Sequence, residues 1–318
     1  MSIDRYENDE FDRPRRRPAR SSGARRVLVL LGVLTFLGIG CCGGVAGLAW
    51  YFIKPTSFLE QTQDYAEARK QFRTTLTRHT RAPQPFLNGK PKDAREVNYQ
   101  SDKLALKAWI GGPEGGLRPA VLFLHGGFAL DATDWIQTQP FRDAGFITMM
   151  PMLRGENGLL GDFSLFYDEV DDALAAAEAL AEQPGVDPNR IYIAGHSAGG
   201  TIAMLAAMSS GRFRACASFS GSPDQVRFVK TDAVQAPFNT EDRQELVMRS
   251  PLAFPKSFKC PARLYYGDDE FLLMLSTPAL AEKAAAAGRD VQSVEVDGDH
   301  FTAVIEAIPL AIAYFQDH

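Results

Sequence analysis

One short segment constrains this chain more than any other: residues 190–200 read Arg-Ile-Tyr-Ile-Ala-Gly-His-Ser-Ala-Gly-Gly. An apolar run typical of a buried strand stops at Gly195, and a helical pattern begins just after Ser197. A strand that turns directly into a helix strains the turn residue, and only the smallest residues fit two positions before and after it. Gly195 and Gly199 occupy those positions. The pattern predicts a nucleophile elbow, against the alternative of a glycine-serine turn between two core elements.

A serine hydroxyl is a poor nucleophile at neutral pH, so the elbow predicts chemistry only if a base lies within hydrogen-bond reach. The chain has five histidines: His79, His125, His196, His300 and His318. The first lies in a polar segment and the last is the final residue. His196 points away from Ser197 on a sharp turn, and His125, which precedes two glycines, suits an oxyanion site better. His300 is the remaining candidate, because loops after parallel strands converge at one sheet edge. Its alternative role is to cap the last helix.

The base needs a carboxylate that fixes its tautomer and stabilises the imidazolium. Residues 266–271 read Tyr-Gly-Asp-Asp-Glu-Phe and follow the strand before the last one, so they offer three acids. Runs of charge usually face solvent, so at most one or two of these acids are functional. The chain order of Ser197, acid and His300 agrees with the Ser, Asp/Glu, His order of one fold family.

From Asp93 onward, short β-rich runs alternate with helical ones, which predicts an α/β domain with a mostly parallel sheet and helices on both faces. The predicted strands are Arg95–Gln100, Leu104–Ile110, Ala120–Leu124, Phe146–Pro151, Arg190–Ala194, Ala215–Ser220, Arg263–Tyr266 and Gln292–Val296. The predicted helices are Val170–Gln183, Ala198–Ser209, Pro278–Ala287 and Phe301–Phe315. Residues 222–258 form a longer excursion between two strands, which predicts the wall of a pocket.

A separate feature precedes this domain. Residues 27–53 run for 27 positions without Asp, Glu, Lys or Arg, which is long enough to cross a membrane, and Trp50 and Tyr51 lie near the far end. We predict one transmembrane helix that binds membrane lipid. The alternatives are a cleaved signal peptide, a lipoprotein signal ending at Cys41 and a buried core helix.

The segments on either side of the apolar run set the expected topology. Residues 1–26 have the composition of a disordered arm, and their arginines near the membrane predict that this end stays cytoplasmic. Residues 54–92 are predicted as a stalk and linker, and residues 93–318 as the catalytic domain on the other side of the membrane. Residues 54–318 hold 26 Lys and Arg against 34 Asp and Glu, so we expect no nucleic-acid partner.

The remaining composition excludes several cofactor classes. No metal-ligand spacing and no dinucleotide glycine fingerprint is present, so neither a metal nor an organic cofactor is expected. Cys216 and Cys260 lie outside the apolar run. They could pair in an oxidising compartment, while two buried thiols are the alternative.

Three motifs together resemble the α/β-hydrolase fold: the elbow at 195–199, Leu-Phe-Leu-His-Gly-Gly at 122–127 and Gly-Asp-His at 298–300. Residues 185–191 and 249–252 are similar to the prolyl oligopeptidase and dienelactone hydrolase-like branch. The resemblance covers residues 95–318. It implies a mostly parallel eight-stranded sheet and a serine hydrolase mechanism.

The resemblance also implies roles for individual residues. Ser197 is the nucleophile, and His300 acts as general base and then as general acid. The backbone N–H groups of Ala198 and of Gly127 or Phe128 form the oxyanion hole.

For the carboxylate of the triad, the resemblance gives two candidates. The family places its acid three residues after the glycine that ends the strand, which gives Glu270. The commoner residue type at that place is Asp, which stands one position earlier at Asp269. We favour Glu270 and keep Asp269 as the alternative.

These inferences predict a membrane-anchored hydrolase that cleaves a small carboxylic ester, or a small amide or peptide, through an acyl-enzyme. One alternative is a prolyl oligopeptidase-type peptidase acting on short peptides. Another is a membrane-tethered binding domain that kept the fold and lost catalysis. Six residues are candidates for either an apolar acyl pocket or the core: Met149, Met150, Met152, Phe163, Phe166 and Phe238.

Overall fold

The computed structural model describes residues 60–82, 89–231 and 236–318. The arm and the transmembrane helix predicted over residues 1–53 lie outside the described residues. Within the described part of the chain, none of the helices combines the length and the apolar composition that a membrane crossing requires.

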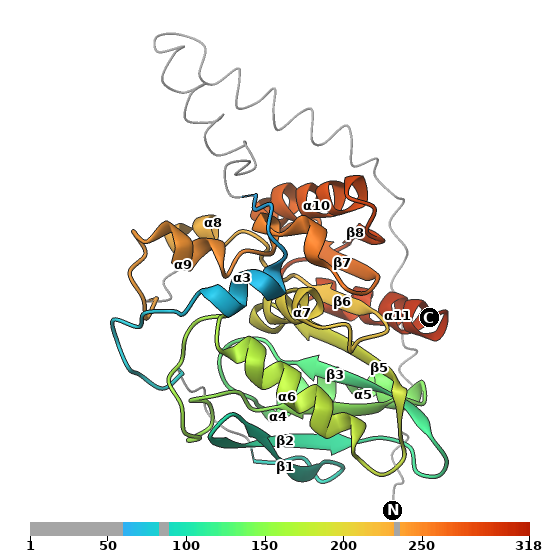
Figure 1. The fold of residues 1–318 in the computed structure, drawn as a ribbon. Coiled ribbons are helices and arrows are strands. Elements are labelled where there is room, and N and C mark those ends of the chain that lie inside the picture. The colour runs from blue at the N-terminus through green and yellow to red at the C-terminus, as the bar shows by residue number, and fades with distance from the viewer. Residues whose placement is uncertain (1–59, 83–88, 232–235) are drawn as a thin grey trace, which may run out of the picture. The chain divides into compact units, whose positions relative to one another are not determined.

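Eight strands form one sheet in the order β1-β2-β4-β3-β5-β6-β7-β8 (Figure 1). Their bounds are β1 Arg95–Ser101, β2 Leu104–Gly111, β3 Arg118–Leu124, β4 Ile147–Pro151, β5 Val186–His196, β6 Cys216–Phe219, β7 Ala262–Gly267 and β8 Val291–Val296. β1 and β2 run antiparallel to each other, and β2 runs antiparallel to β4. All pairs from β4 through β3 to β8 are parallel. The mostly parallel eight-stranded sheet predicted from the sequence is therefore confirmed.

Helices cover both faces of the sheet (Figure 1). One face packs against α6 Glu169–Ala181, α7 Ala198–Ser209 and α10 Phe271–Ala286, and the other against α4 Ala132–Gln137, α5 Gln139–Asp143 and α11 Ala303–Gln316. Two short helices, α8 Gln225–Thr231 and α9 Arg243–Val247, and the 3-10 turns Pro251–Ala253 and Pro255–Ser257 lie between β6 and β7.

Helix α10 begins earlier than the sequence predicted, at Phe271 instead of Pro278. Proline lacks the N–H that would bond to the fourth residue before it, so it usually marks a helix start. Here Pro278 stands inside the helix, which loses one backbone bond but keeps its first turn through the hydrogen bond from Met274 N–H to the Glu270 carbonyl (2.9 Å).

Residues 60–82, here called the N-terminal strap, pack along the domain. The strap contains α3, Tyr65–Gln71, and pairs through Leu76 with Phe238 in an antiparallel bridge. Tyr65 is fully buried, its N–H donates to Ser257 Oγ (2.9 Å), and its hydroxyl donates to the Met248 carbonyl (2.9 Å). The sequence pattern of this segment is typical of a polar stalk, whereas residues 60–82 are held against the domain by buried side chains such as Tyr65.

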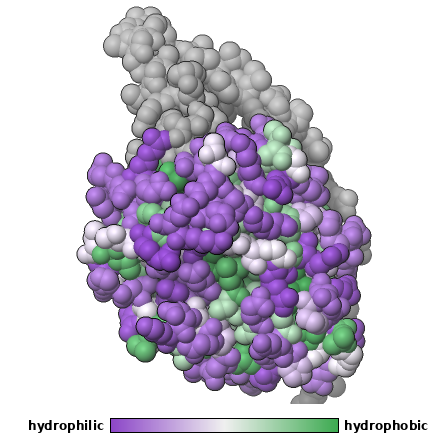
Figure 2. Space-filling model, viewed as in Figure 1, coloured by the Kyte–Doolittle hydropathy of each residue, from purple (hydrophilic) through white to green (hydrophobic). Residues whose placement is uncertain are grey.

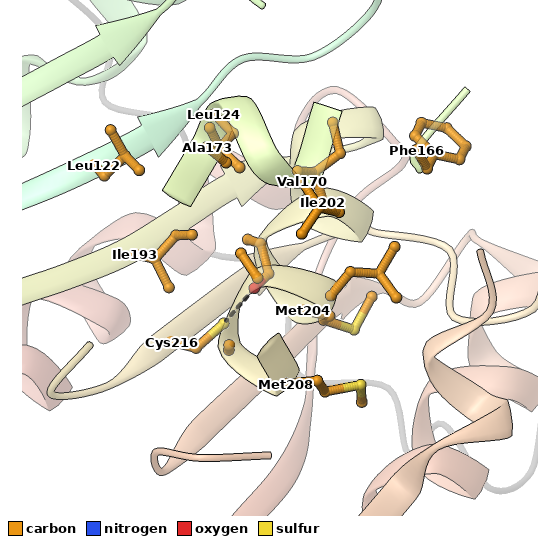
Figure 3. Packing of buried hydrophobic residues seen from close by; sticks show 14 of the residues in the cluster. Leu122, Leu124, Phe166, Val170, Ala173, Ile193, Ile202, Met204, Met208 and Cys216 are labelled. Carbon is orange, nitrogen blue, oxygen red and sulfur yellow. Dashed lines mark hydrogen bonds between the residues drawn. The ribbon is translucent and has the colours of Figure 1, made fainter. Parts of the chain in front are cut away.

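The buried core lies on both faces of the sheet. In the larger cluster, Val170 from α6 and Ile202 from α7 gather with Leu122 and Ile193 from the central strands (Figure 3). The surface in Figure 2 is mainly hydrophilic, with apolar residues scattered over it.

Cys216 and Cys260 are free, buried thiols in this structure. Burial raises the pKa of the Cys260 thiol to about 12, so it stays protonated at neutral pH. The alternatives for this pair were a disulfide and two buried thiols, and the structure has the two thiols.

Candidate active site

Ser197 sits at the tip of the turn between β5 and α7. Its backbone has φ 53° and ψ −116°, a conformation that side-chain-bearing residues rarely adopt. Such strain persists only where the surroundings impose it, and it concentrates at functional sites. Here the Ser197 N–H donates to the Phe219 carbonyl (2.8 Å), which ties the turn to the neighbouring strand β6.

The two glycines of the motif permit close approach of backbones. A Cβ added to Gly199 would collide with the carbonyl oxygens of Leu124 and His125, and one added to Gly195 would collide with the carbonyl of Gly199. The start of α7 therefore lies directly against the end of β3. This contact brings the loop after β3 next to Ser197.

Three side chains form a continuous hydrogen-bonded chain. His300 Nε2 lies 2.8 Å from Ser197 Oγ, and His300 Nδ1 lies 2.7 Å from Glu270 Oε1. An ionised carboxylate only accepts hydrogen bonds, so Nδ1 carries the proton and Nε2 accepts from the serine hydroxyl. The structure thus brings Ser197, His300 and Glu270 together in the geometry of a catalytic triad.

Two glycines also explain why the acid and the base meet. A Cβ on Gly267, which ends β7, would collide with the carbonyl oxygen of Gly298 in the loop after β8. Gly298 itself has φ 120°, which favours glycine. The absence of both side chains lets the loop that carries Glu270 lie against the loop that carries His300.

Glu270 is held at its second oxygen as well. Oε2 accepts hydrogen bonds from the Ser220 hydroxyl (2.6 Å) and the Gly267 N–H (2.7 Å). Burial acts to raise the pKa of this carboxyl, but the hydrogen bonds from His300, Ser220 and Gly267 outweigh it and lower the pKa from its ordinary value. Glu270 is therefore ionised at neutral pH, as a triad carboxylate must be.

Asp269, the alternative acid, has a different place. Its backbone N–H donates to the Gly298 carbonyl (3.2 Å), and no hydrogen bond of the described residues joins its carboxylate to His300. The third acid, Asp268, accepts the Gly298 N–H through Oδ1 (2.9 Å). Both aspartates connect the two loops, and Glu270 is the one that reaches the histidine.

The predicted oxyanion donors lie around Ser197. Ala198 is the first residue of α7, so no carbonyl within the helix can accept its N–H. Gly127 and Phe128 follow β3, Gly127 has φ 68°, and all three residues line the cavity that contains Ser197. The arrangement fits an oxyanion hole made of backbone N–H groups from two different loops.

A buried pair that the sequence pattern does not reveal, His125 and Glu156, holds the start of the oxyanion loop. His125 Nε2 lies 3.0 Å from Glu156 Oε2, and its Nδ1 lies 3.0 Å from the Gly126 carbonyl. Burial acts to lower the pKa of His125, but the Glu156 carboxylate outweighs it and raises the pKa to about 9. His125 is therefore a buried imidazolium that donates from both nitrogens. No local sequence signal links it to Glu156.

His196 has a structural contact with the base. Its Nε2–H donates to the backbone carbonyl of His300 (2.8 Å), and the two rings lie 5.2 Å apart. Burial lowers the pKa of His196, which keeps the ring neutral. The elbow thus holds the backbone of the loop that carries His300.

A cavity of about 640 Å³ opens in front of the triad. Its walls include Ser222 and Phe228 from the 222–258 excursion and Leu272 and Leu273 from α10. A second cavity of about 750 Å³ adjoins it across Ser197 and His300 and extends toward α4. The site is therefore open on two sides of the serine, with room for a group on each side of a scissile bond.

Of the six residues that the sequence proposed for either a pocket or the core, the structure places one in this cavity, Phe166. The other five are buried in the core: Met149, Met150, Met152, Phe163 and Phe238. Strand methionines alternate between the two sheet faces, and both faces are covered by helices here. Among the described residues there is also no cluster of His, Cys, Asp and Glu suited to hold a metal ion.

The fold and the linked Ser197, His300 and Glu270 define a serine hydrolase of the α/β-hydrolase class. The model of the prolyl oligopeptidase family matches residues 132–267, which include the elbow. The uncharacterized peptidase YtmA of Bacillus subtilis is 30% identical over 133 residues, which cover 41% of this chain and 52% of YtmA. The chain therefore spans about half the length of that relative.

Solved structures agree on the fold. An acylaminoacyl peptidase of Pyrococcus horikoshii aligns with a TM-score of 0.60 and 22% identity, over 70% of this chain and 41% of that one. A putative dienelactone hydrolase of Klebsiella pneumoniae aligns with a TM-score of 0.55 and 17% identity, over 71% of this chain and 98% of that one. The predicted resemblance to the prolyl oligopeptidase and dienelactone hydrolase-like branch of the α/β-hydrolase fold is confirmed.

Proposed function

We propose that this chain is a membrane-anchored serine hydrolase that cleaves a small carboxylic ester, or a small amide or peptide, through an acyl-enzyme. One observation supports this proposal most: the hydrogen-bonded chain from Glu270 through His300 to Ser197 ends at a cavity of about 640 Å³. An inactive binding domain has no need of a strained serine with an aligned base and acid.

The proposed reaction follows from this geometry. Ser197 Oγ attacks the acyl carbonyl carbon while its proton passes to His300 Nε2. The N–H groups of Ala198 and the Gly127–Phe128 loop stabilise the oxyanion, which can be worth ~3–4 kcal/mol of barrier. His300 then protonates the leaving alcohol or amine. A water molecule, deprotonated by His300, releases the acid and restores Ser197.

Cleavage of short peptides is the second candidate. It is favoured by the match to the prolyl oligopeptidase family and by the relatives that are named as peptidases. The cavity on each side of Ser197 offers space for residues before and after a scissile bond.

The test is labelling and turnover with the purified full chain. A fluorescent phosphonate should label the wild type and leave Ser197→Ala unlabelled, and absence of a Ser197 adduct on folded protein would refute the enzyme proposal. A panel of p-nitrophenyl esters and aminoacyl amides then separates the two candidates. Turnover of amides at rates comparable with those of esters would favour the peptidase.

The membrane anchor remains part of the proposal. It is supported by the 27 uncharged residues from Val27 to Ile53 and by the arginines before them. We propose that the catalytic domain faces away from the cytoplasm. Protease added outside intact cells should then digest the domain, and full protection would refute this orientation.

A further inference from the structure

Besides Ser197, the backbone is strained at the part of the cavity wall that precedes α6. Leu165 and Phe166 are consecutive residues with φ of 54° and 72°. Such angles are uncommon for residues with a Cβ and are maintained only where the surroundings enforce them. Phe166 is buried and lines the cavity in front of Ser197. Its ring packs against Phe128 and Phe228, with centroids 6.2 and 5.8 Å away.

A buried arginine binds the carbonyl groups just before Phe166. Arg249 Nε donates to the carbonyl oxygens of Ser164 (3.1 Å) and Leu165 (2.8 Å), and Nη2 donates to that of Ser164 (2.8 Å). Arg249 is fully buried. A planar guanidinium with several donors in fixed directions is suited to hold two successive carbonyls at one angle.

A buried carboxylate binds the amides of the same turn. Glu169 accepts the N–H groups of Ser164 (2.6 Å) and Tyr167 (3.1 Å) and the Ser164 hydroxyl (2.6 Å). The turn around Phe166 is therefore held from both sides by charged groups. It cannot relax to negative φ without breaking buried hydrogen bonds, which is costly.

The N-terminal strap reaches the same guanidinium. Thr74 Oγ1 accepts from Arg249 Nη2 (2.8 Å) and donates to Glu245 Oε2 (2.7 Å), which also pairs with Arg249 Nη1 (2.6 Å). The other Glu245 oxygen accepts the Thr75 N–H (2.7 Å). The strap thus completes the set of partners that fixes the position of Arg249.

We propose that Arg249 is a positioning residue for Phe166, and that the strap acts through it to set which apolar group the cavity accepts. This inference rests on the proposed hydrolase function and extends it to specificity. Neither Arg249 nor Thr74 lines the cavity, so both act through the Phe166 turn. Where the hydrogen bonds from Arg249 to this turn are weakened, the ring of Phe166 withdraws from Phe128 and Phe228. The cavity then admits a longer acyl group.

Thr74→Val is the most informative variant. It keeps the shape of the side chain and removes only the hydroxyl, whereas loss of Arg249 would leave Glu245 charged, buried and uncompensated and could unfold the protein. The matched control is Ser257→Ala. It removes another hydrogen bond of the strap, the one from Tyr65 N–H, at a site away from Phe166.

The first readout is the ratio of kcat/KM for long against short acyl esters. We expect Thr74→Val to raise this ratio about fivefold or more, and Ser257→Ala to leave it unchanged. Phe166→Ala should raise the ratio as well. The double variant Thr74→Val with Phe166→Ala should show no further change beyond Phe166→Ala, because both substitutions act on the same ring.

The second readout is hydrogen exchange of the amides in residues 164–168, which requires no activity. We expect faster exchange in Thr74→Val than in the wild type or in Ser257→Ala. An unchanged acyl ratio or unchanged exchange in Thr74→Val would overturn the inference. A wild type that turns over no ester or amide would refute the proposed function, and the exchange measurement would still decide whether Thr74 and Arg249 hold the Phe166 turn.

Discussion

His300 Nε2 lies 2.8 Å from Ser197 Oγ, although the two residues are 103 positions apart in the chain. The serine is carried by the tight turn after β5 and the histidine by the loop after β8. Both loops leave the carboxyl ends of parallel strands, where ligand sites of such sheets form. The close contact of Gly267 with Gly298 then places Glu270 behind the histidine.

The two candidate acids can be separated by isosteric substitution. Glu270→Gln should lower kcat by about 10²- to 10⁴-fold, because the amide cannot stabilise the imidazolium that forms in the transition state. Asp269→Asn is the control and should change kcat little. Kinetics with one p-nitrophenyl ester measure both variants. A large loss confined to Asp269→Asn would show that the acid is misassigned.

The close backbone contact at the elbow predicts a steric effect on stability. Gly199→Ala should lower the free energy of unfolding by about 3 kcal/mol, because its Cβ would collide with the Leu124 carbonyl. Gly211→Ala is the matched control, since a Cβ there meets nothing within 4 Å, and should change stability by no more than about 0.5 kcal/mol. Urea unfolding measures both. Equal stabilities of the two variants would contradict the close contact of α7 with β3.

The Ser220 hydroxyl predicts a stability difference that depends on pH. It is one of the donors that lower the pKa of Glu270 from the ordinary value of 4.5. Ser220→Ala should reduce the free energy of unfolding at pH 7 by about 1–2 kcal/mol. A lowered pKa contributes stability that is present above pH 4.5 and is lost as the pH falls through the pKa of the folded protein. The difference in free energy of unfolding between the wild type and Ser220→Ala should therefore become smaller in acid.

Ser222→Ala is the control for Ser220→Ala, because Ser222 lines the same cavity without contacting Glu270. Its difference from the wild type should stay constant between pH 3 and pH 7. A deficit of Ser220→Ala that is equally independent of pH would contradict the assigned hydrogen bond to the carboxylate.

The buried pair of His125 and Glu156 predicts loss of stability in mild alkali. The pKa of His125 rises from 6.5 to about 9 on folding. A raised pKa contributes stability that is fully present below pH 6.5, declines above it and is gone above about pH 9. The wild type should lose about 3 kcal/mol across this window in urea unfolding. His125→Gln should lack this decline. If its free energy of unfolding fell with rising pH as steeply as that of the wild type, the result would count against a charged His125.

Much of the fold follows from patterns in the sequence. The strands from Leu104 to Val296 lie within a few residues of their predicted ranges, because alternating apolar runs and turn residues act locally. Ser197 and His300 could be proposed in the same way, from the elbow and from its place after the last strand.

Other features depend on neighbours in space. From the sequence, only the family spacing favoured Glu270 over Asp269. In the structure, where the Gly267 and Gly298 loops lie against each other, Glu270 is the acid that is hydrogen-bonded to His300. The strap resembled a polar stalk because its partners, such as Ser257 and Glu245, lie far along the chain.

A strained serine after a buried strand follows from the sequence alone, since the sterics of glycine in a tight turn involve only adjacent residues. The folded arrangement of the loops sets which carboxylate joins the histidine and which aromatic ring reaches the cavity. Those outcomes depend on hydrogen bonds and ring contacts between separate loops, and their geometry exists only once the sheet has brought the loops together.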